Sequence, residues 1–346
     1  MPPNYRNFRK NVPWLIVFLE AAFIILFYIF PLDGCARSIS SYSDFQDVSH
    51  MAIFGFSFFL TFLKRYGFSS IGFNLLIIVL GVQYSVLVED LLFFLFPVKS
   101  EVCPRRMIKA IMSMTAVVIS SGAVLGKTNP VQLILMTVVE IIVFHISRWI
   151  NNRVLKIPDN ISMMLVHLFG TYFGLTFSSR FPEPSPRSEK NASTPKSDLL
   201  SILGTLFLWV FWPSFNSVLA ENQSTAIYST YFALAASAVT AFVLSVLTTK
   251  DGKFRMTHIH SAVLAGGVTV GFAAHRIEHP WIAMILGLLA SVITVLGSHC
   301  LQTCLNPALK LHDTSGIHFT FGLPGVLGGL AQIVLSVIKN ETSGRR

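Results

Sequence analysis

Two ionisable residues accompany one apolar segment of the sequence, since Asp159 precedes and His167 interrupts the run 161–177. An imidazole at the depth of a membrane core costs on the order of several kcal/mol unless it faces a protein interior or a polar pathway. Eight helical residues rise about 12 Å and make a little over two turns, which leaves both side chains within roughly 80° of each other. A helix lining a polar path would carry such a carboxylate at its mouth and an imidazole at mid-depth. The pattern equally fits a histidine bonded inside a helical bundle and an aspartate that caps its helix.

The composition indicates a membrane protein. Of 346 residues, 53% are hydrophobic and 12% are charged, and the mean hydropathy is +0.63. Soluble domains carry about 25% charged residues, whereas the apolar blocks of this chain are about 17–25 residues long, as a bilayer-crossing helix requires. The net charge of +9 comes from basic residues in short segments between these blocks. Because this distribution is typical of membrane loops, we expect no nucleic-acid partner.

Eleven apolar segments predict an all-α, polytopic bundle of membrane-spanning helices. The basic N-terminal segment leads into an apolar run that is too long for a cleavable signal, so we expect a signal anchor with a cytoplasmic N-terminus. Lys and Arg are in slight excess on the same side, which has the sign of the positive-inside rule. The expected spans are 12–31, 49–64, 70–96, 107–126, 130–150, 160–179, 198–219, 226–248, 258–275, 280–299 and 319–338.

We expect one membrane domain, 1–346, whose two halves are joined by a flexible cytoplasmic linker. Segment 178–197 is rich in Pro, Ser and charge, and it separates six spans from five. The sequons at Asn222 and Asn340 fall on the outer side and are candidate N-glycosylation sites. The odd number of spans would place the C-terminal end outside, which suggests that a twelfth span is missing.

Motifs of enzymes and metal sites are missing from the sequence. Neither HExxH nor GxSxG occurs, and the four cysteines have no ligand spacing with histidine. We therefore expect no catalytic residue, no metal site and no cofactor, and a transport or structural role in the lipid bilayer.

Several motifs resemble the Rh branch of the ammonium transporter family. They are GAVLGK at 122–127, FLWVFWPSFNS at 207–217, HSAVLAGGVTVG at 260–271 and HDTSGIHFTFGLPGVLGG at 312–329. WPSFNS together with LAGGVxVG is highly specific, and the similarity covers nearly the whole chain. Within the family, the chain is most similar to the erythroid Rh blood-group polypeptides.

The resemblance implies a helical bundle around one pore per subunit, assembled as a trimer in the plasma membrane. Conducting members have an aspartate at the pore mouth, two stacked pore histidines and two phenylalanine rings above them. Asp159 and His167 match the aspartate and the first histidine, and Phe215 of WPSFNS matches one ring. Phe321 stands where the second histidine of a His-Gly-x-Pro-Gly element belongs, and Ser121 is assigned to the other ring position.

These replacements change the flux of ammonia or ammonium that we expect. Phe321 removes a hydrogen-bond donor and acceptor and fills a single-file path at mid-depth, which favours dewetting or closure. Ser121 would widen the outer constriction and weaken cation–π binding there, and we expect the Phe321 effect to dominate. His318, three residues before Phe321, is the candidate to substitute for the lost histidine.

Two functions follow from this pattern. One is Rh-family transport of ammonia or ammonium through a partly degenerate pore, with carbon dioxide as a further candidate permeant. The other is a non-conducting, antigen-bearing subunit that assembles with a conducting Rh glycoprotein in the red-cell membrane and contacts the membrane skeleton. The Phe321 replacement favours the second function, and the Asp159–His167 pair favours the first. Homotrimer and heterotrimer both stay open.

Overall fold

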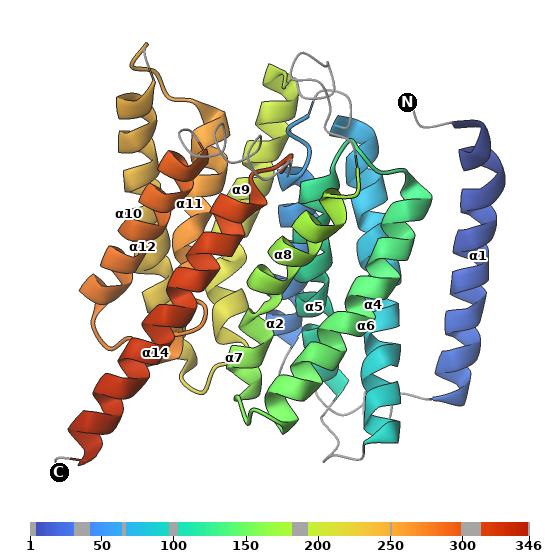
Figure 1. Ribbon diagram of the computed structural model, residues 1–346, viewed down its shortest axis with the longest axis horizontal. Helices are drawn as coiled ribbons and strands as arrows, with labels where there is room; N and C mark the ends of the chain where they lie inside the picture. Colours follow the sequence, from blue (N-terminus) through green and yellow to red (C-terminus); the bar gives the residue numbers. More distant parts are fainter. Residues whose placement is uncertain are drawn as a thin grey trace.

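Each of the eleven predicted spans coincides with a helical segment in the computed structural model, which describes residues 5–30, 42–63, 67–96, 103–181, 193–249, 251–298 and 313–344 (Figure 1). No β-strand occurs within these ranges, so the all-α bundle is confirmed. Among the same residues, eight helices are long and apolar enough to cross a membrane. The elements are α1 (Tyr5–Ile29), α2 (Tyr42–His50), η2 (Met51–Phe56), α3 (Ser57–Phe59), α4 (Gly67–Leu95), α5 (Cys103–Val124), α6 (Pro130–Arg153), α7 (Asp159–Met164), α8 (Val166–Ser178), α9 (Pro195–Ser217), α10 (Gln223–Thr248), α11 (Met256–Val270), η5 (Ala274–Arg276), α12 (Pro280–Leu296), η7 (His318–Gly322) and α14 (Leu323–Gly344).

Four of the predicted spans differ by five or more residues at an end. The first begins seven residues earlier, at Tyr5, and the last ends six residues later, at Gly344. The second begins seven residues earlier than expected, because α2 is helical although it carries Asp44 and Asp47 and has little hydropathy of its own. Its continuation η2 is a π-helix, with one residue more per turn than an α-helix would have. The ninth span ends at Val270 and is followed by the short 3-10 turn η5. Residues 182–192 of the predicted linker lie outside the described residues.

The helices begin where their sequences supply caps. Asn129 caps α6 reciprocally with Gln132, and Thr194 caps α9 reciprocally with Ser197. In both helices a proline follows the cap, where its missing N–H is unneeded and its fixed φ favours the helix. These capping boxes explain why both helices start sharply after a loop.

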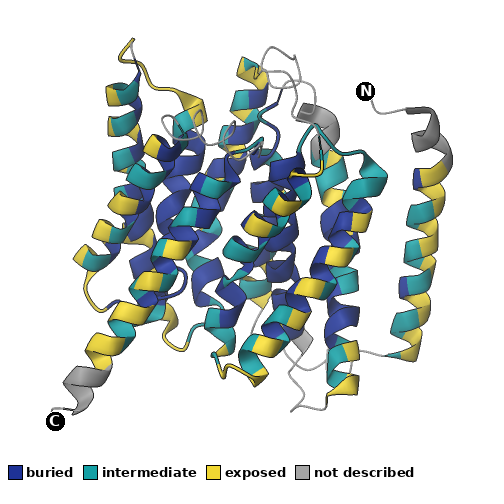
Figure 2. Cartoon of the chain, in the orientation of Figure 1, coloured by how far each residue is buried: buried dark blue, intermediate teal, exposed yellow. Residues whose placement is uncertain are grey.

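Helix α5 is central and α1 is peripheral. Of the apolar window in α5, 89% is buried inside the bundle, against 11% of the window in α1. Figure 1 shows α1 at one edge of the molecule, and Figure 2 shows exposed residues along most of its length. Outward-facing residues elsewhere are also apolar, as expected for a surface that contacts lipid tails.

Glycines let α5 and α8 approach each other closely. A side-chain carbon on Gly170 would overlap the backbone of Ala116, and one on Gly174 would overlap the backbone of Ser120. The Ser120 hydroxyl donates to the Gly170 carbonyl oxygen at 2.7 Å. In a membrane, small residues allow such backbone contact where lipid offers no hydrophobic drive for association. The two helices therefore run parallel, in a fixed register that places the site residues relative to one another.

Candidate functional site

His167 lies at the centre of a cluster of aromatic rings. It is fully buried on α8, and its ring stacks on Phe321 at 6.1 Å with an interplanar angle of 12°. The ring centroids of Trp212 and Phe215 on α9 lie 5.7 and 5.9 Å from the imidazole. Neither imidazole nitrogen has a hydrogen-bond partner among the described residues. An imidazole that is buried without partners retains its capacity to donate to or accept from a passing polar molecule.

Two π-helical turns contribute rings to this cluster. Phe56 ends η2, and Phe321 belongs to η7, and their ring centroids are 6.2 Å apart. The ring centroid of Phe59 lies 6.2 Å from that of Phe321 and 5.2 Å from that of His260. The rings of Phe215, His167, Phe321, Phe59 and His260 thus form a continuous column through the bundle, which we call the aromatic column. Single π-turns inside α-helices occur frequently at functional sites.

His318 lies outside the aromatic column. Its ring contacts Tyr172 at 5.9 Å and Phe319 at 4.9 Å, and within the described residues it makes no ring contact with His167. Tyr172 is 41% exposed, so His318 faces the periphery of α8. His318 therefore does not lie beside His167, where it would have to be to take the place of the lost pore histidine.

Ser121 and Phe215 lie on opposite sides of His167 along the bundle. Ser121 follows Ser120, which is level with Gly174, about two turns beyond His167 on α8. A side-chain carbon on Gly271 would meet both the Asn216 Oδ1 and the Met164 Sδ atoms, at 3.1 and 3.3 Å. Phe215 is consequently near the level of Met164, before His167. The two positions assigned to one outer constriction do not form a ring together.

Met112, on the same helix as Ser121, lies nearer to the level of Phe215. By the register of α5 against α8, Met112 lies level with Val166, one turn before the Ala116–Gly170 contact. It is fully buried in the same core cluster as Phe215. The Ser121 hydroxyl instead donates to the Val118 carbonyl oxygen at 2.7 Å.

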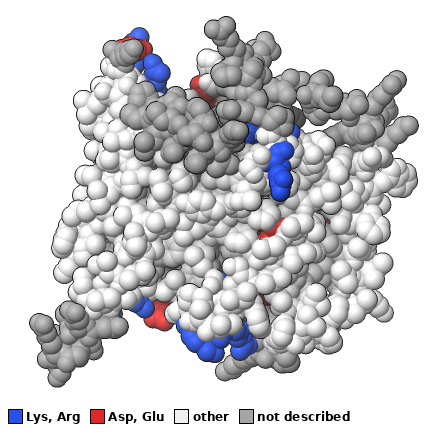
Figure 3. Space-filling model, viewed as in Figure 1, with Lys and Arg blue, Asp and Glu red and all other residues white. Residues whose placement is uncertain are grey.

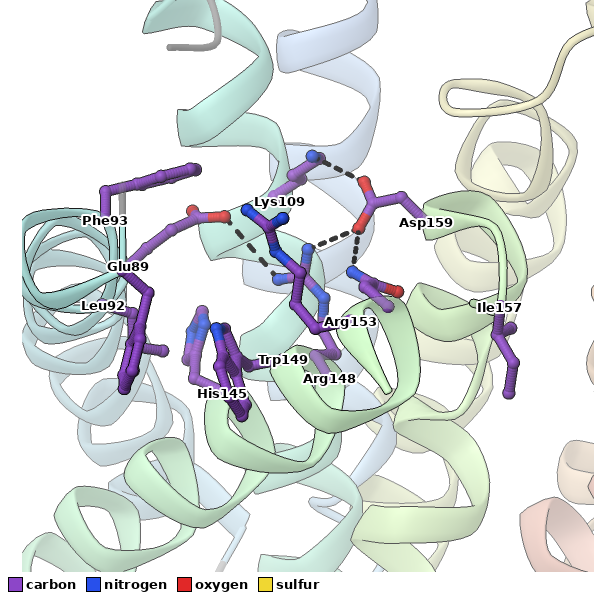
Figure 4. Close-up of a pocket in the computed structure, with 12 residues that line it drawn as sticks. Glu89, Leu92, Phe93, Lys109, His145, Arg148, Trp149, Arg153, Ile157 and Asp159 are labelled. Atoms are coloured by element: carbon purple, nitrogen blue, oxygen red, sulfur yellow. Dashed lines mark hydrogen bonds and ion pairs between the residues drawn. The ribbon is translucent and has the colours of Figure 1, made fainter. Parts of the chain in front are cut away.

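Asp159 is held by cations rather than presented to an open path. Its carboxylate oxygens lie 2.5 Å from the Lys109 Nζ atom and 2.8 Å from the Arg148 Nη2 atom (Figure 4). Asn152 donates to the same carboxylate at 3.0 Å, and Arg148 also faces Glu89 at 3.8 Å. The helical line from Asp159 to His167 is interrupted at Leu165, between α7 and α8. The expected carboxylate at a pore mouth is thus neutralised by α5 and α6.

A cavity of about 340 Å³ adjoins this ion cluster, and we call it the Asp159 cavity. It is walled by α4, α5, α6 and the segment that leads into α7. Figure 4 shows Glu89 and Asp159 on opposite sides, with Arg148 between them. Its lining residues are Glu89, Leu92, Phe93, Phe96, Lys109, His145, Arg148, Trp149, Asn152, Arg153, Ile157 and Asp159.

Two other titratable side chains at membrane depth have found partners, although the buried Trp212 Nε1 atom beside His167 has none among the described residues. Glu140 accepts a hydrogen bond from Ser120 at 2.5 Å, and His145 is bonded to the Ser85 hydroxyl at 2.7 Å. His167 differs, because both of its nitrogens are left without one. No group of three or more metal-ligating side chains occurs within the described residues.

Sequence reasoning missed Lys109, Arg148, Trp212 and Phe56. Lys109 and Arg148 fall inside predicted spans, and basic residues at such positions signal a buried carboxylate partner. Trp212 stands in the WPSFNS motif that was noted for Phe215 alone. Phe56 depends on a π-turn, for which the sequence carries no local signal.

Comparisons with known proteins agree with this architecture. Residues 13–345 match the model of the Ammonium Transporter Family. The chain is 41% identical over 350 residues to the blood group Rh(D) polypeptide of Rattus norvegicus, covering 96% of this chain and 82% of that protein. It is also 41% identical over 356 residues to the ammonium transporter Rh type A of Canis lupus familiaris, covering 97% and 86%.

The solved structure of Rh50 from Nitrosomonas europaea, a channel of the Rhesus protein family, superimposes with a TM-score of 0.77. Its sequence identity is 30%, over 87% of this chain and 80% of that chain. These matches span nearly all of the helices described above, including those that carry the aromatic column. The chain is therefore a multi-pass membrane protein of the ammonium transporter family, in its Rh branch.

Proposed function

We propose that this chain forms a path for ammonia or ammonium along the aromatic column, and that Phe321 restricts the flux through it. The observation that carries the proposal is the unpartnered imidazole of His167, stacked on Phe321 at 6.1 Å. Family membership supplies the transport function, and the column supplies the place where a permeant would meet a polar group.

The physical reason is the cost of moving a small polar molecule through hydrocarbon. Aromatic faces such as those of Phe215 and Trp212 stabilise a cation, and a neutral imidazole offers a donor and an acceptor deeper in the path. The Phe321 ring offers neither and occupies the position next to His167. A hydrophobic constriction of this kind gates by dewetting, so we expect a low flux.

The test is ammonia-driven change of internal pH, measured by stopped flow in proteoliposomes that contain this chain alone. We expect the wild type to exceed empty liposomes only modestly, His167→Phe to match empty liposomes, and Phe321→His to increase the rate several-fold. Phe321→Leu reduces the bulk of the side chain without adding a polar group, so comparing it with Phe321→His separates these two contributions to the rate. Phe242→His, at a ring that is 39% exposed on α10, is the matched control and should leave the rate unchanged.

The outcome that contradicts the proposal is equal rates for the wild type, His167→Phe and Phe321→His in folded protein. That outcome would favour the second candidate function, a non-conducting structural and antigen-bearing subunit that assembles with a conducting Rh glycoprotein in the red-cell membrane. The same stack of Phe321 on His167 supports this candidate, whereas the similarity to Rh transporters does not favour it.

We further propose residence in the plasma membrane with a cytoplasmic N-terminus. Arg106, Lys109 and Arg148 lie on the side assigned as outer, yet all three are buried in ion pairs. Counting only loop residues therefore enlarges the excess of basic residues on the N-terminal side, which supports this orientation. The full chain carrying an N-terminal epitope, labelled with antibody before and after permeabilisation of the cell, tests it.

The remaining expectations belong to the same proposal. The chain would form a homotrimer, or a heterotrimer with other Rh-family subunits, in contact with lipid and with the membrane skeleton. It would act as a single membrane domain, 1–346, with 178–197 as a flexible cytoplasmic linker, and without enzymatic activity. Asn222 is exposed and caps α10 with its Oδ1 atom, which leaves the nitrogen available to a glycan. The side chain of the other sequon, Asn340, lies outside the described residues.

A further inference from the structure

The Asp159 cavity carries an excess of positive charge. Its cationic side chains are Lys109, Arg148 and Arg153, and its carboxylates are Glu89 and Asp159, so one positive charge is left over. The neighbouring carboxylate of Asp90 does not balance it, because that group is paired with Arg106.

Arg153 is the cation of this set without an ion-pair partner among the described residues. It is the last residue of α6, and it is exposed, while its guanidinium points into the cavity in Figure 4. Five N–H donors in a planar fork suit an oxyanion better than a cation or a neutral amine.

The indole of Trp149 lines the same cavity with its ring but does not present its N–H to it. The Nε1 atom of Trp149 is shielded from solvent and has no hydrogen-bond partner among the described residues, and Trp149 lines the cavity. Its indole ring packs on Phe96 at 4.7 Å. Because water does not reach this N–H, an acceptor in the cavity does not reach it either.

The position of the cavity suggests where such an acceptor comes from. Trp149, Phe93 and Phe96 form an aromatic wall at the same end of the bundle as α7, and aromatic rings mark the level of lipid headgroups. Lys and Arg gather at this lower edge in Figure 3, below a face that is largely free of charge. The cavity, of about 340 Å³, is large enough to admit one phosphate group.

We propose that the Asp159 cavity binds a phosphate group, with the guanidinium of Arg153 as its donor. The phosphate can belong to a lipid headgroup or to a free anion, since the recognition chemistry is shared. This site is separate from the aromatic column, and its net charge disfavours ammonium.

The test uses the full chain in detergent micelles and reads binding rather than transport. One arm adds inorganic phosphate, with chloride at equal ionic strength as the control, and follows the thermal unfolding midpoint. The other arm adds phosphatidic acid or phosphatidylcholine and counts bound lipids by native mass spectrometry. The variants are Arg153→Gln, Arg153→Lys, Trp149→Phe and the matched control Arg180→Gln, an exposed arginine near the end of α8.

We expect Arg153→Gln to weaken phosphate-group binding about tenfold or more, because one charge-assisted hydrogen-bond donor is lost. Arg153→Lys should lose several-fold, because it keeps the charge but not the planar fork, whereas Trp149→Phe and Arg180→Gln should match the wild type. Saturation by phosphatidic acid alone would identify a headgroup site, and saturation by inorganic phosphate would identify a free-anion site. Equal affinities for Arg153→Gln and Arg180→Gln, or binding in neither arm, would overturn the proposal.

Discussion

Asp159 and His167 lie eight residues apart, yet their surroundings differ in kind. Asp159 contacts two cations and an amide, whereas His167 contacts only aromatic rings and leaves both nitrogens without a partner among the described residues. Because removing one partner of a buried ion pair leaves an uncompensated charge, the Asp159 cluster depends on all of its members. Within the part of the chain that the structure describes, the buried imidazole has no such partners. The difference separates a carboxylate whose neighbours satisfy it from an imidazole whose donor and acceptor are unused.

The largest expected effect comes from breaking the Asp159 cluster. Arg148→Met leaves Asp159 and Glu89 short of a cation, and we expect the free energy of unfolding to fall by about 3–5 kcal/mol. Denaturation in mixed micelles, followed by circular dichroism, measures it. The control is Arg255→Met, whose pair with Asp251 is exposed, and for which we expect less than about 1 kcal/mol. Similar losses in both variants would remove the distinction between the two regions.

The next largest effect is expected at the close contact between α5 and α8, which positions both Asp159 and His167. Gly170→Ala would push a methyl group into the Ala116 backbone and shift α8 against α5. We expect a loss of about 1–3 kcal/mol, together with weaker ion pairing of Asp159 and altered packing on His167. Gly329→Ala is the matched control, since nothing lies within 4 Å of the added carbon. Its unfolding free energy should stay unchanged or rise slightly, and a loss equal to that of Gly170→Ala would contradict the close-contact account.

A smaller effect is expected on how the stability of the fold depends on pH. It comes from Asp313, which lies before the start of η7. Burial raises the pKa of Asp313, although its carboxylate accepts a hydrogen bond from the His318 backbone N–H at 2.8 Å. The folded state then binds more protons than the unfolded state above pH 3.8, so stability decreases as pH rises from there through the raised pKa. Asp313→Asn keeps the acceptor and should flatten this slope. Unfolding midpoints at several pH values test it, and an unchanged slope would exclude Asp313 as its source.

The smallest change in stability is expected at His167. His167→Phe removes two unpartnered nitrogens and keeps the ring stacked on Phe321, so the free energy of unfolding should shift by less than about 1 kcal/mol. Flux through the subunit should nevertheless disappear. Parallel unfolding and stopped-flow measurements on one preparation give both values. A loss of several kcal/mol would show that the imidazole is a structural group like Asp159.

The helices could be predicted from the sequence because length and hydropathy report directly on membrane spans. All eleven segments were placed, and caps such as Asn129 and Thr194 explain two of the sharp starts. The central position of His167 also followed from its apolar flanks. The family resemblance supplied Phe215 and Phe321, and the structure brings both into contact with His167.

Interactions between distant segments were not predictable in the same way. The partners of Asp159 lie on two other helices, and Lys109 is separated from it by fifty positions in the chain. The π-turns η2 and η7 arise from packing, since one extra residue per turn has no local propensity signal. The level of Ser121 depends on the α5–α8 register, which only the glycine contacts determine.

The ion cluster also constrains how the protein is made. Lys109 and Arg148 lie near the ends of α5 and α6 that adjoin α7, where a cation inserted without its partner costs less than the value of about 2.5–3.5 kcal/mol found at the centre of a membrane helix. The carboxylate that contacts both cations arrives only with α7, at residue 159. Helices α5 and α6 therefore gain their full stability in lipid only after α7 has been synthesised.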